Sequence, residues 1–505
     1  MGQFVHCLYT ISKEISYRMG AFNAEFFAIG LAIIGVVIII SALLSGLVER
    51  SGLPQVAVFL ALGAALGPFG LGVLQISLDS PALHIVATLS LALVLFTDAV
   101  SLNITDVKRR TALVLRVLGP GTVLTAALIA FAGWWLLDIS IPAAAMLGAA
   151  LASTDPVLLR GLLRRRDVPD DARHALQLES GLNDLVLLPV VLIAISLFDQ
   201  GAAVTNGSLG KLALHLLILG PGAGILVGLL AVAALDLVRK RLGVRRDYES
   251  LYSLGVALAA FGAAEAVHGS GFIAAFAAGL TIAALDVELC DCFVEYGGVT
   301  AEMFLLFTFV VLGSSLIWTG FTIINGATLL FTAVALFIRT PVYLLSLLGS
   351  GVERRDRLLI AWFGPSGLSS LLLILLPVFA GLPGSERLFS VCSLVVLASV
   401  VLHGGSPMLL AGADRKRARR EEREAAKESA DQPTLSDAER ISIEELQRLW
   451  ESNQPVTILD VRTERSLEGS QTQARGAIRV APQYVVAQVR ELGLREDAWV
   501  VAYCT

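Results

Sequence analysis

The chain has 505 residues, of which 55% are hydrophobic and only 16% charged; its net charge is −5 and its mean hydropathy +0.74. Soluble domains carry about 25% charged residues, so this composition excludes an ordinary soluble protein over most of the chain. The five cysteines are scattered, with neither a disulfide framework nor a zinc-type spacing. We expect a lipid bilayer around the chain, no nucleic-acid partner and no cofactor.

The chain divides into four segments of different composition. Residues 1–24 form an N-terminal segment without the apolar core and cleavage site of a signal peptide. Residues 25–411 are apolar runs with short polar breaks, residues 412–435 are a charged linker of mixed sign, and residues 436–505 have a soluble composition. We predict an all-α polytopic membrane domain, a cytoplasmic linker and a partial α/β tail.

A membrane span needs about 20 apolar residues to cross roughly 30 Å of hydrocarbon. Thirteen stretches of the membrane domain are predicted as spans, although the second and ninth are short. They are 25–47, 52–70, 83–104, 111–135, 141–163, 173–199, 211–238, 248–267, 271–286, 299–318, 324–349, 358–380 and 386–411. A count of twelve stays open, because the break between the eighth and ninth stretches is narrow.

Basic residues in short loops mark the cytoplasmic side of a membrane protein. Here they all follow odd-numbered spans, whereas the loops 71–82, 136–140, 200–210 and 319–323 contain neither Lys nor Arg. The basic loop residues are Lys108, Arg109, Arg110, Arg164, Arg165, Arg166, Arg173, Arg239, Lys240, Arg241, Arg245, Arg246, Arg354, Arg355, Arg357, Arg415, Lys416 and Arg417. We predict a multi-pass protein of the cell membrane with its N-terminus outside and its C-terminus in the cytoplasm.

Polar residues interrupt two of the apolar spans at depth. Asp184 lies about 15–17 Å from the cytoplasmic end of its span, and Asp155 roughly 12 Å from the same face. An ionisable residue at mid-membrane costs about 2.5–3.5 kcal/mol and is therefore a functional candidate by default. Neither side chain is long enough to reach the membrane surface from this depth. We predict that the two carboxylates form a functional pair.

The span around Asp184 carries two neighbouring polar stripes. Residues four apart share a helix face, so Ser180 lies with Asp184, and Glu179 lies with Asn183. A buried carboxylate needs a partner, and the comparably deep cation is Arg339, about 15 Å into its own span. We predict a structural ion pair between Glu179 and Arg339. The alternative is that Arg339 binds backbone carbonyls of an interrupted helix.

Two spans contain residues that interrupt a helix. Thr154-Asp155-Pro156 places a proline at membrane depth, and Phe363-Gly364-Pro365-Ser366-Gly367 is a second break. Proline removes an amide donor and clashes with the preceding turn, which leaves carbonyls free to bind a cation. The two breaks lie seven spans apart, so their helices run in opposite directions. Paired interruptions in inverted halves indicate the ion site of a transporter.

The predicted chemistry is a competition between two ligands for one carboxylate. A desolvated carboxylate is neutralised equally well by a proton or by a small monovalent cation. Hard cations prefer oxygen ligands, which Asp184, Asp155, the Ser180 hydroxyl and the Thr154 carbonyl can supply. A site that holds either ligand, but not both, exchanges them when it alternates between the two faces of the membrane.

Four motifs occur in order within residues 25–411. They are Ser-Thr-Asp-Pro-Val at 153–157, Glu-Ser-x-x-Asn-Asp at 179–184, Arg339, and Trp-Phe-Gly-Pro-x-Gly-Leu-Ser-Ser at 362–370. This combination resembles the NhaP/NHE-type monovalent cation:proton antiporters. The resemblance implies a thirteen-helix inverted-repeat fold, a homodimer, and elevator-like exchange of one Na⁺ for one H⁺.

The resemblance also implies roles for individual residues. Asp184 would bind the cation and the proton, Asn183 would stabilise it, and Ser180, Asp155 and Thr154 match cation-site positions. Glu179 and Arg339 match the buried ion pair of the family. Electrogenic relatives carry a second Asp where this chain has Asn183, so the resemblance favours electroneutral exchange.

Two positions fit the resemblance less well. Ser366 stands where the family motif usually carries Arg, which changes the local charge. Asp98 matches a family acidic position, but it lies close to the cytoplasmic end of its span. For Asp98, capping or snorkelling competes with cation coordination.

The tail contains Asp460-Val461-Arg462, Gly476-Ala477-Ile478 and Val501-Ala502-Tyr503-Cys504, a pattern that resembles a rhodanese domain. The resemblance implies that Cys504 matches a persulfide-forming nucleophile, whose thiol is activated by an anion-binding loop. The sequence ends at Thr505, so we expect an incomplete rhodanese-like domain.

Three functions follow from these patterns. The leading hypothesis is a secondary transporter, not an enzyme, that exchanges Na⁺, or Li⁺ or K⁺, for H⁺. The alternatives are a K⁺/H⁺ efflux antiporter and a membrane-anchored sulfurtransferase that uses Cys504. The number of spans and the paired deep carboxylates exceed what a membrane anchor requires.

Overall fold

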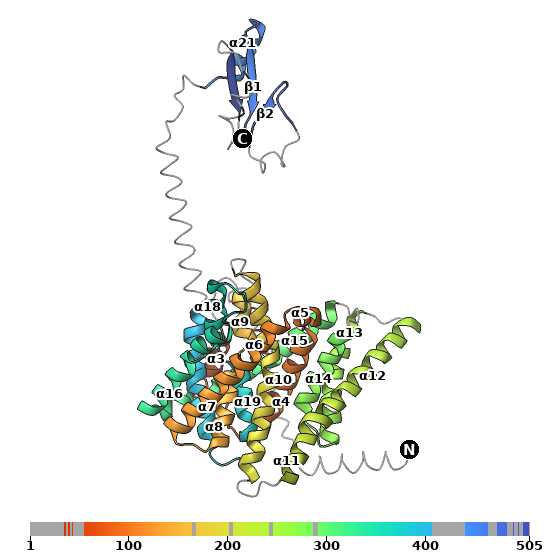
Figure 1. The fold of residues 1–505 in the computed structure, drawn as a ribbon, viewed down its shortest axis with the longest axis vertical. Helices are drawn as coiled ribbons and strands as arrows, with labels where there is room; N and C mark the ends of the chain where they lie inside the picture. The colour runs from red at the N-terminus through yellow and green to blue at the C-terminus, as the bar shows by residue number, and fades with distance from the viewer. Residues whose placement is uncertain are drawn as a thin grey trace. The chain divides into compact units, whose positions relative to one another are not determined.

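The computed structural model describes most of the membrane domain and part of the tail. The described residues are 35–36, 39–40, 43, 55–163, 168–200, 206–241, 246–285, 291–406, 440–462, 472–481, 488, 493 and 498–503. The chain forms two compact units, Met1–Gly412 and Ala413–Thr505, each of which is considered by itself (Figure 1).

The described part of the first unit is helical. Its first elements, up to the helix that carries Asp184, are α3 (Gln55–Leu66), α4 (Pro81–Val100), α5 (Ile104–Arg109), α6 (Thr111–Arg116), the π-helix η1 (Val117–Val123), α7 (Leu124–Leu137), α8 (Ile141–Ala152), α9 (Pro156–Leu163) and α10 (Asp170–Gln200). There follow α11 (Asn206–Ala213), the π-helix η3 (Leu214–Leu219), α12 (Gly220–Arg241), α13 (Arg246–Ala266), α14 (Gly271–Ala284) and α15 (Asp291–Val311). The last are the π-helix η4 (Leu312–Leu316), the 3₁₀-helix η5 (Ile317–Ile323), α16 (Gly326–Phe337), α17 (Arg339–Ser346), α18 (Arg354–Trp362), α19 (Leu368–Phe379) and the helix Ser385–Ser406.

Within the described residues, eight helical stretches are long and apolar enough to cross a membrane. Four shorter apolar helices accompany them: α3, Leu251–Ala266 of α13, α14 and α19. The prediction of a helical multi-span membrane fold is therefore confirmed. The count of thirteen stays a prediction, because the first predicted span, 25–47, lies almost entirely outside the described residues.

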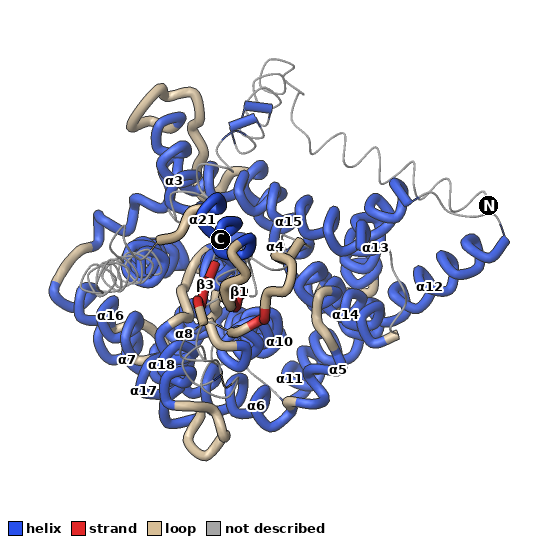
Figure 2. Tube along the Cα trace, turned by 90° about the horizontal axis from the view of Figure 1, so that it is seen from above, coloured by secondary structure: helices blue, strands red, loops and turns tan. Residues whose placement is uncertain are grey.

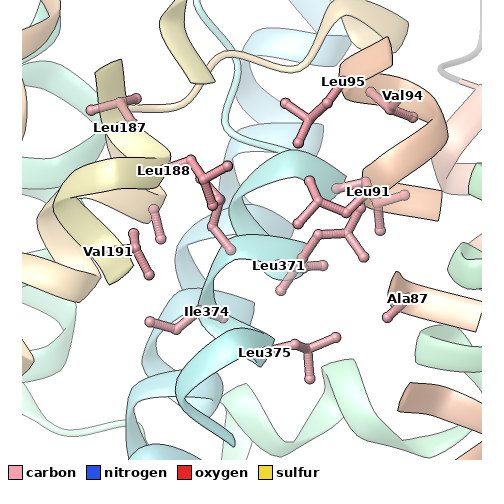
Figure 3. Packing of buried hydrophobic residues seen from close by; sticks show 14 of the residues in the cluster. Ala87, Leu91, Val94, Leu95, Leu187, Leu188, Val191, Leu371, Ile374 and Leu375 are labelled. Carbon is pink, nitrogen blue, oxygen red and sulfur yellow. The ribbon is translucent and has the colours of Figure 1, made fainter. Parts of the chain in front are cut away.

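The helices of the first unit pack side by side. In both views α12, α13 and α14 lie at one end of the unit, and α7 and α16 lie at the other (Figures 1 and 2). Between these ends, α4, α10 and α19 pack together through aliphatic side chains (Figure 3). The labelled residues of this aliphatic packing are Ala87, Leu91, Val94, Leu95, Leu187, Leu188, Val191, Leu371, Ile374 and Leu375. All ten are buried in one continuous apolar core.

The described part of the tail unit is a small parallel sheet with one helix. Helix α21 (Ile443–Glu451) begins with a capping box in which Ser442 and Glu445 bond each other's backbone amides. Strands β1 (Val456–Asp460), β2 (Ile478–Arg479) and β3 (Trp499–Tyr503) pair in the order β2-β1-β3, all parallel.

A buried ion pair closes the end of the central strand of this sheet. Arg462 donates to both carboxylate oxygens of Asp460, at 2.9 and 2.7 Å. These bonds hold the pKa of Asp460 well below its usual range. Cys504 follows β3 directly but lies outside the described residues, so the predicted nucleophile has no described environment.

Candidate functional site

Both predicted helix interruptions are present in the structure. Helix α8 ends at Ala152 and α9 begins at Pro156, and α18 ends at Trp362 and α19 begins at Leu368. The residues between them have extended or irregular backbone, as expected where proline removes a helical hydrogen bond. The two breaks meet each other, and we call their contact the helix crossing (residues 153–155 and 363–367).

Main-chain and hydroxyl groups join the two sides of the helix crossing. The amide of Asp155 donates to the carbonyl of Pro365 at 2.9 Å. The Ser366 hydroxyl donates to the carbonyl of Leu151 at 2.8 Å, which satisfies an acceptor at the end of α8. The residue that departs from the family motif, Ser366, thus binds the opposite half of the crossing.

The carboxylate of Asp155 accepts an amide from each of the two half-helices. Its Oδ1 accepts from Val157 N of α9 at 2.8 Å, and its Oδ2 accepts from Leu368 N of α19 at 2.7 Å. Both amides belong to helix starts, where N–H groups lack intrahelical partners and the helix dipole favours negative charge. Gly367 makes this possible, because a Cβ there would occupy the place of the Asp155 carboxylate. Asp155 is fully buried.

Asp184 has a different environment. It projects from the middle of α10 and is 5% exposed. Ser153 Oγ donates to its Oδ1 at 2.6 Å, and no other hydrogen bond to this carboxylate is found in the part of the chain that the structure describes. Asp155 is near enough to interact with it electrostatically. The structure thus brings Asp155 close to Asp184, and their role as a functional pair stays a prediction.

Asn183 binds the loop that precedes Asp155. Its Nδ2 donates to the Thr154 carbonyl at 3.3 Å. Its Oδ1 is buried and has no partner among the described residues. The Thr154 carbonyl, predicted as a cation ligand, already accepts one donor, and a carbonyl oxygen has a second lone pair.

Glu179 and Arg339 form the predicted ion pair. Arg339 Nη1 donates to Glu179 Oε1 at 2.6 Å and Nη2 donates to Oε2 at 2.7 Å, a bidentate geometry. Arg339 Nη2 also donates to the carbonyl of Ile360 at 3.2 Å, so the alternative bond to a helix end is present as well. Glu179 is 0% exposed and Arg339 6%. Breaking such a buried pair costs about 3–5 kcal/mol, because it leaves one charge alone.

The ion pair is attached to the helix crossing through Thr154. The Thr154 hydroxyl donates to Glu179 Oε1 at 2.8 Å. Gly364 lies against the Arg339 guanidinium, where a Cβ would overlap it. Two residues of this cluster escaped the sequence analysis: Tyr343 and Thr122. A signal for Tyr343 existed, because it lies four residues after Arg339 and hence on the same helix face.

Two further predicted site residues, Ser180 and Asp98, have hydrogen bonds near their own positions in the chain. Ser180 Oγ donates to the Gln177 carbonyl of its own helix at 3.3 Å. Asp98 is partly buried near the end of α4, and its carbonyl accepts from the Ser101 hydroxyl. Their predicted roles in cation binding remain predictions.

Interrupted helices that cross beside buried carboxylates, within a multi-span helical protein, define the class of secondary transporters. The chain belongs to the sodium/hydrogen exchanger family: the family model described as "Sodium/hydrogen exchanger, transmembrane" matches residues 36–410. The family expected from the four motifs is confirmed, and it is a family of transporters, not of enzymes.

Relatives differ in the cation that their names give. The K(+)/H(+) antiporter NhaP2 of Shewanella oneidensis is 29% identical over 399 residues, which cover 76% of this chain and 66% of that protein. The Na(+)/H(+) antiporter 2 of Zygosaccharomyces rouxii is 24% identical over 273 residues, covering 51% and 33% respectively. The chain spans just under two thirds of the length of the bacterial relative.

A solved structure has the same fold. The sodium proton antiporter MjNhaP1 of Methanocaldococcus jannaschii, in a structure at pH 8, superposes with a TM-score of 0.61. The likeness covers 76% of this chain and 100% of that chain, at 22% sequence identity. At this identity the likeness establishes the fold alone.

Proposed function

We propose that the chain exchanges a monovalent cation for a proton across the cell membrane, with both ligands competing for Asp184. The observation that carries this proposal is that Asp184 is buried and yet has few hydrogen-bond partners among the described residues. Its carboxylate is 5% exposed, yet one serine hydroxyl is the hydrogen-bond donor found for it among the described residues. A buried charge needs neutralisation, which a proton or a cation supplies.

The neighbouring groups support this role. The Thr154 carbonyl accepts from Asn183, the residue before Asp184, and the carboxylate of Asp155 interacts electrostatically with Asp184. Oxygen is the preferred ligand of hard cations. Asn183 contributes no charge, so a single proton balances a single monovalent cation. We therefore propose electroneutral exchange, with Asp184, Asp155, Asn183 and the Thr154 carbonyl around the cation, and Ser180 as a further ligand.

Reconstituted vesicles test the proposal. The purified protein is placed in proteoliposomes that hold a preset pH gradient and a pH-sensitive dye, and Na⁺, Li⁺ or K⁺ is added outside. The wild-type protein should dissipate the gradient, and Asp184→Asn should abolish dissipation while the protein stays folded. Asp236→Asn, which changes an exposed aspartate paired with Lys240, is the matched control and should exchange normally. Normal exchange by Asp184→Asn would contradict the proposal.

The same vesicles address the cation and the stoichiometry. Relatives named for K⁺/H⁺ and for Na⁺/H⁺ exchange make K⁺ and Na⁺ the two leading cations. The cation with the lowest KM identifies the substrate. Electroneutral exchange predicts that an imposed membrane potential leaves the rate unchanged, and a potential-dependent rate would contradict the role given to Asn183.

We propose, from the family resemblance and the loop charges, a homodimer with the C-terminus in the cytoplasm. Lys108 and Arg109 end the short helix α5, on the side assigned to the cytoplasm. Cross-linking in membranes tests the dimer, and protease access to the tail in inverted vesicles tests the orientation.

A second candidate function, sulfur transfer, belongs to the tail. It is favoured by the parallel sheet, in which β3 leads directly into Cys504. The full chain should then form thiocyanate from thiosulfate and cyanide, and Cys504→Ser should not. Absence of thiocyanate from the wild-type chain would contradict it.

A further inference from the structure

Tyr343 is a fully buried side chain beside the ion pair. It lies on α17 and its ring is 0% exposed, with the Arg339 guanidinium carbon 3.8 Å from the ring centroid. Its hydroxyl donates to Glu179 Oε1 at 2.9 Å. The edge of the tyrosine ring packs against Gly121: a Cβ at that glycine would lie 3.2 Å from the ring. The hydroxyl is thus fixed in place by the packing of the ring.

Thr122 stands behind the tyrosine hydroxyl. It belongs to the π-helix η1, which contains Pro120, and its Oγ1 lies 3.0 Å from the Tyr343 hydroxyl oxygen and 3.2 Å from the Val117 carbonyl. Each of the two hydroxyls has one proton. Tyr343 gives its proton to Glu179, so the Thr122 proton lies in a three-centre contact between the Tyr343 oxygen and the Val117 carbonyl. The result is a chain of hydroxyl groups from η1 through Tyr343 to Glu179.

The chain of hydroxyl groups ends on the oxygen that also holds the helix crossing. Glu179 Oε1 accepts from Tyr343 and from the Thr154 hydroxyl, which lies in the loop between α8 and α9. The preceding residue of that loop, Ser153, donates to Asp184. A shift of the Glu179 carboxylate therefore moves Thr154, and with it the groups around Asp184.

We propose that Tyr343, with Thr122 behind it, is a positioning residue for the cation site. It fixes the Glu179 carboxylate, and Glu179 fixes the loop that faces Asp184. The inference rests on the proposed function. It assigns an effect on cation affinity to Tyr343, which bonds Glu179, and to Thr122, which contacts Tyr343. Because these hydroxyls act on site geometry, their loss changes KM more than kcat.

The first test is Tyr343→Phe in the vesicle assay. This change removes the hydroxyl and keeps the ring against Gly121 and Arg339. The KM for the cation should rise by up to about tenfold, which corresponds to about 1.4 kcal/mol, near the upper end of the net contribution of a typical intramolecular hydrogen bond. The kcat should stay within about twofold of wild type, because Asp184 and its exchange of ligands are unchanged. Tyr252→Phe is the matched control: its hydroxyl donates to the Ala231 carbonyl between α13 and α12, and its KM should not change.

The second test asks whether Thr122 acts through Tyr343. Thr122→Val should raise KM in the wild-type background and have no further effect in the Tyr343→Phe background, since the shared contact is already lost. Thr122→Ser keeps the hydroxyl and should restore the wild-type KM. If Tyr343→Phe yields no folded protein, Thr122→Val alone decides the matter.

The outcomes separate this inference from the proposed function. Wild-type exchange with an unchanged KM in Tyr343→Phe, or in Thr122→Val, overturns the positioning role and leaves the antiport proposal standing. Additive effects of the two changes overturn the chain from Thr122 through Tyr343. A fall in folded protein with an unchanged KM indicates a purely structural tyrosine and also overturns it. Absence of exchange by the wild-type protein overturns the proposed function, and this inference with it.

Discussion

The helix crossing around Asp155 and the neighbouring face of α10 around Asp184 satisfy a buried carboxylate in opposite ways. At the crossing, each oxygen of Asp155 accepts a backbone amide from a different half-helix. On α10, Asp184 accepts the Ser153 hydroxyl, and the described residues offer it no second donor. Both side chains are buried, so burial alone does not distinguish them.

The difference teaches which carboxylate can change its ligand. A carboxylate held by backbone amides is stabilised as an anion; it loses those bonds if it moves, and they weaken if it is protonated. A carboxylate with one hydroxyl partner can accept a proton or a cation without breaking the fold. The comparison favours Asp155 as the fixed member of the pair and Asp184 as the member that exchanges ligands.

Gly367→Ala should have the largest effect on the difference between the Asp155 and Asp184 sites. The added Cβ would overlap the Asp155 carboxylate where it accepts from Leu368, so the two half-helices can no longer share it. We expect little folded protein and at least about a tenfold loss of exchange, since both caps and the packing are disturbed. Size-exclusion chromatography after graded heating measures the folded fraction. Gly262→Ala in α13, where a Cβ meets nothing, is the control and should fold normally.

Asp155→Asn should have an intermediate effect, and it distinguishes a fixed carboxylate from an exchanging ligand at this position. Asparagine retains one acceptor oxygen and places an NH₂ group against the other amide, which costs about 1–2 kcal/mol of capping energy. The thermal midpoint should fall more than in Asp184→Asn, while some exchange persists. An unchanged midpoint with complete loss of exchange would instead make Asp155 an exchanging ligand like Asp184.

Ser153→Ala should have the smallest effect. Among the described residues it removes the hydroxyl that donates to Asp184, and it leaves the amides on Asp155 in place. The KM for the cation should rise several-fold with an unchanged thermal midpoint. Ser90→Ala removes a buried serine that bonds Thr308 and serves as the control. Equal KM values in the two variants would show that Ser153 does not support Asp184.

Much of the fold follows from the sequence, because lipid imposes long apolar runs and makes interruptions conspicuous. The breaks at Thr154-Asp155-Pro156 and around Pro365 are where the structure has them. The partnership of Glu179 and Arg339 followed from depth, because each charge needs a counter-charge at the same level. Both alternatives for Arg339 turned out to hold, since its guanidinium has enough N–H groups for a carboxylate and a carbonyl.

Other parts of the site were beyond sequence reasoning for a physical reason. The partners of Asp155 are backbone amides, which every residue except proline carries and which therefore leave no sequence signal. The Leu368 amide is also 213 residues away, so only the helix crossing brings it near. The hydroxyl of Ser180 binds its own helix, a choice of side-chain rotation that the periodicity of α10 does not determine.

The aliphatic packing between α4, α10 and α19 has a consequence for the ion gradient across the membrane. Leu187, Leu188 and Val191 follow Asp184 by three, four and seven residues, so they continue its side of α10 (Figure 3). Water molecules line up only where polar atoms hold them, and this packing offers none in its side chains. Protons hop along such lines of water, so in the proposed exchanger this packing would separate Asp184 from water on that side. A coupled exchanger with a continuous line of water at this place would let protons cross without a cation, and this leak would discharge the gradient that drives it.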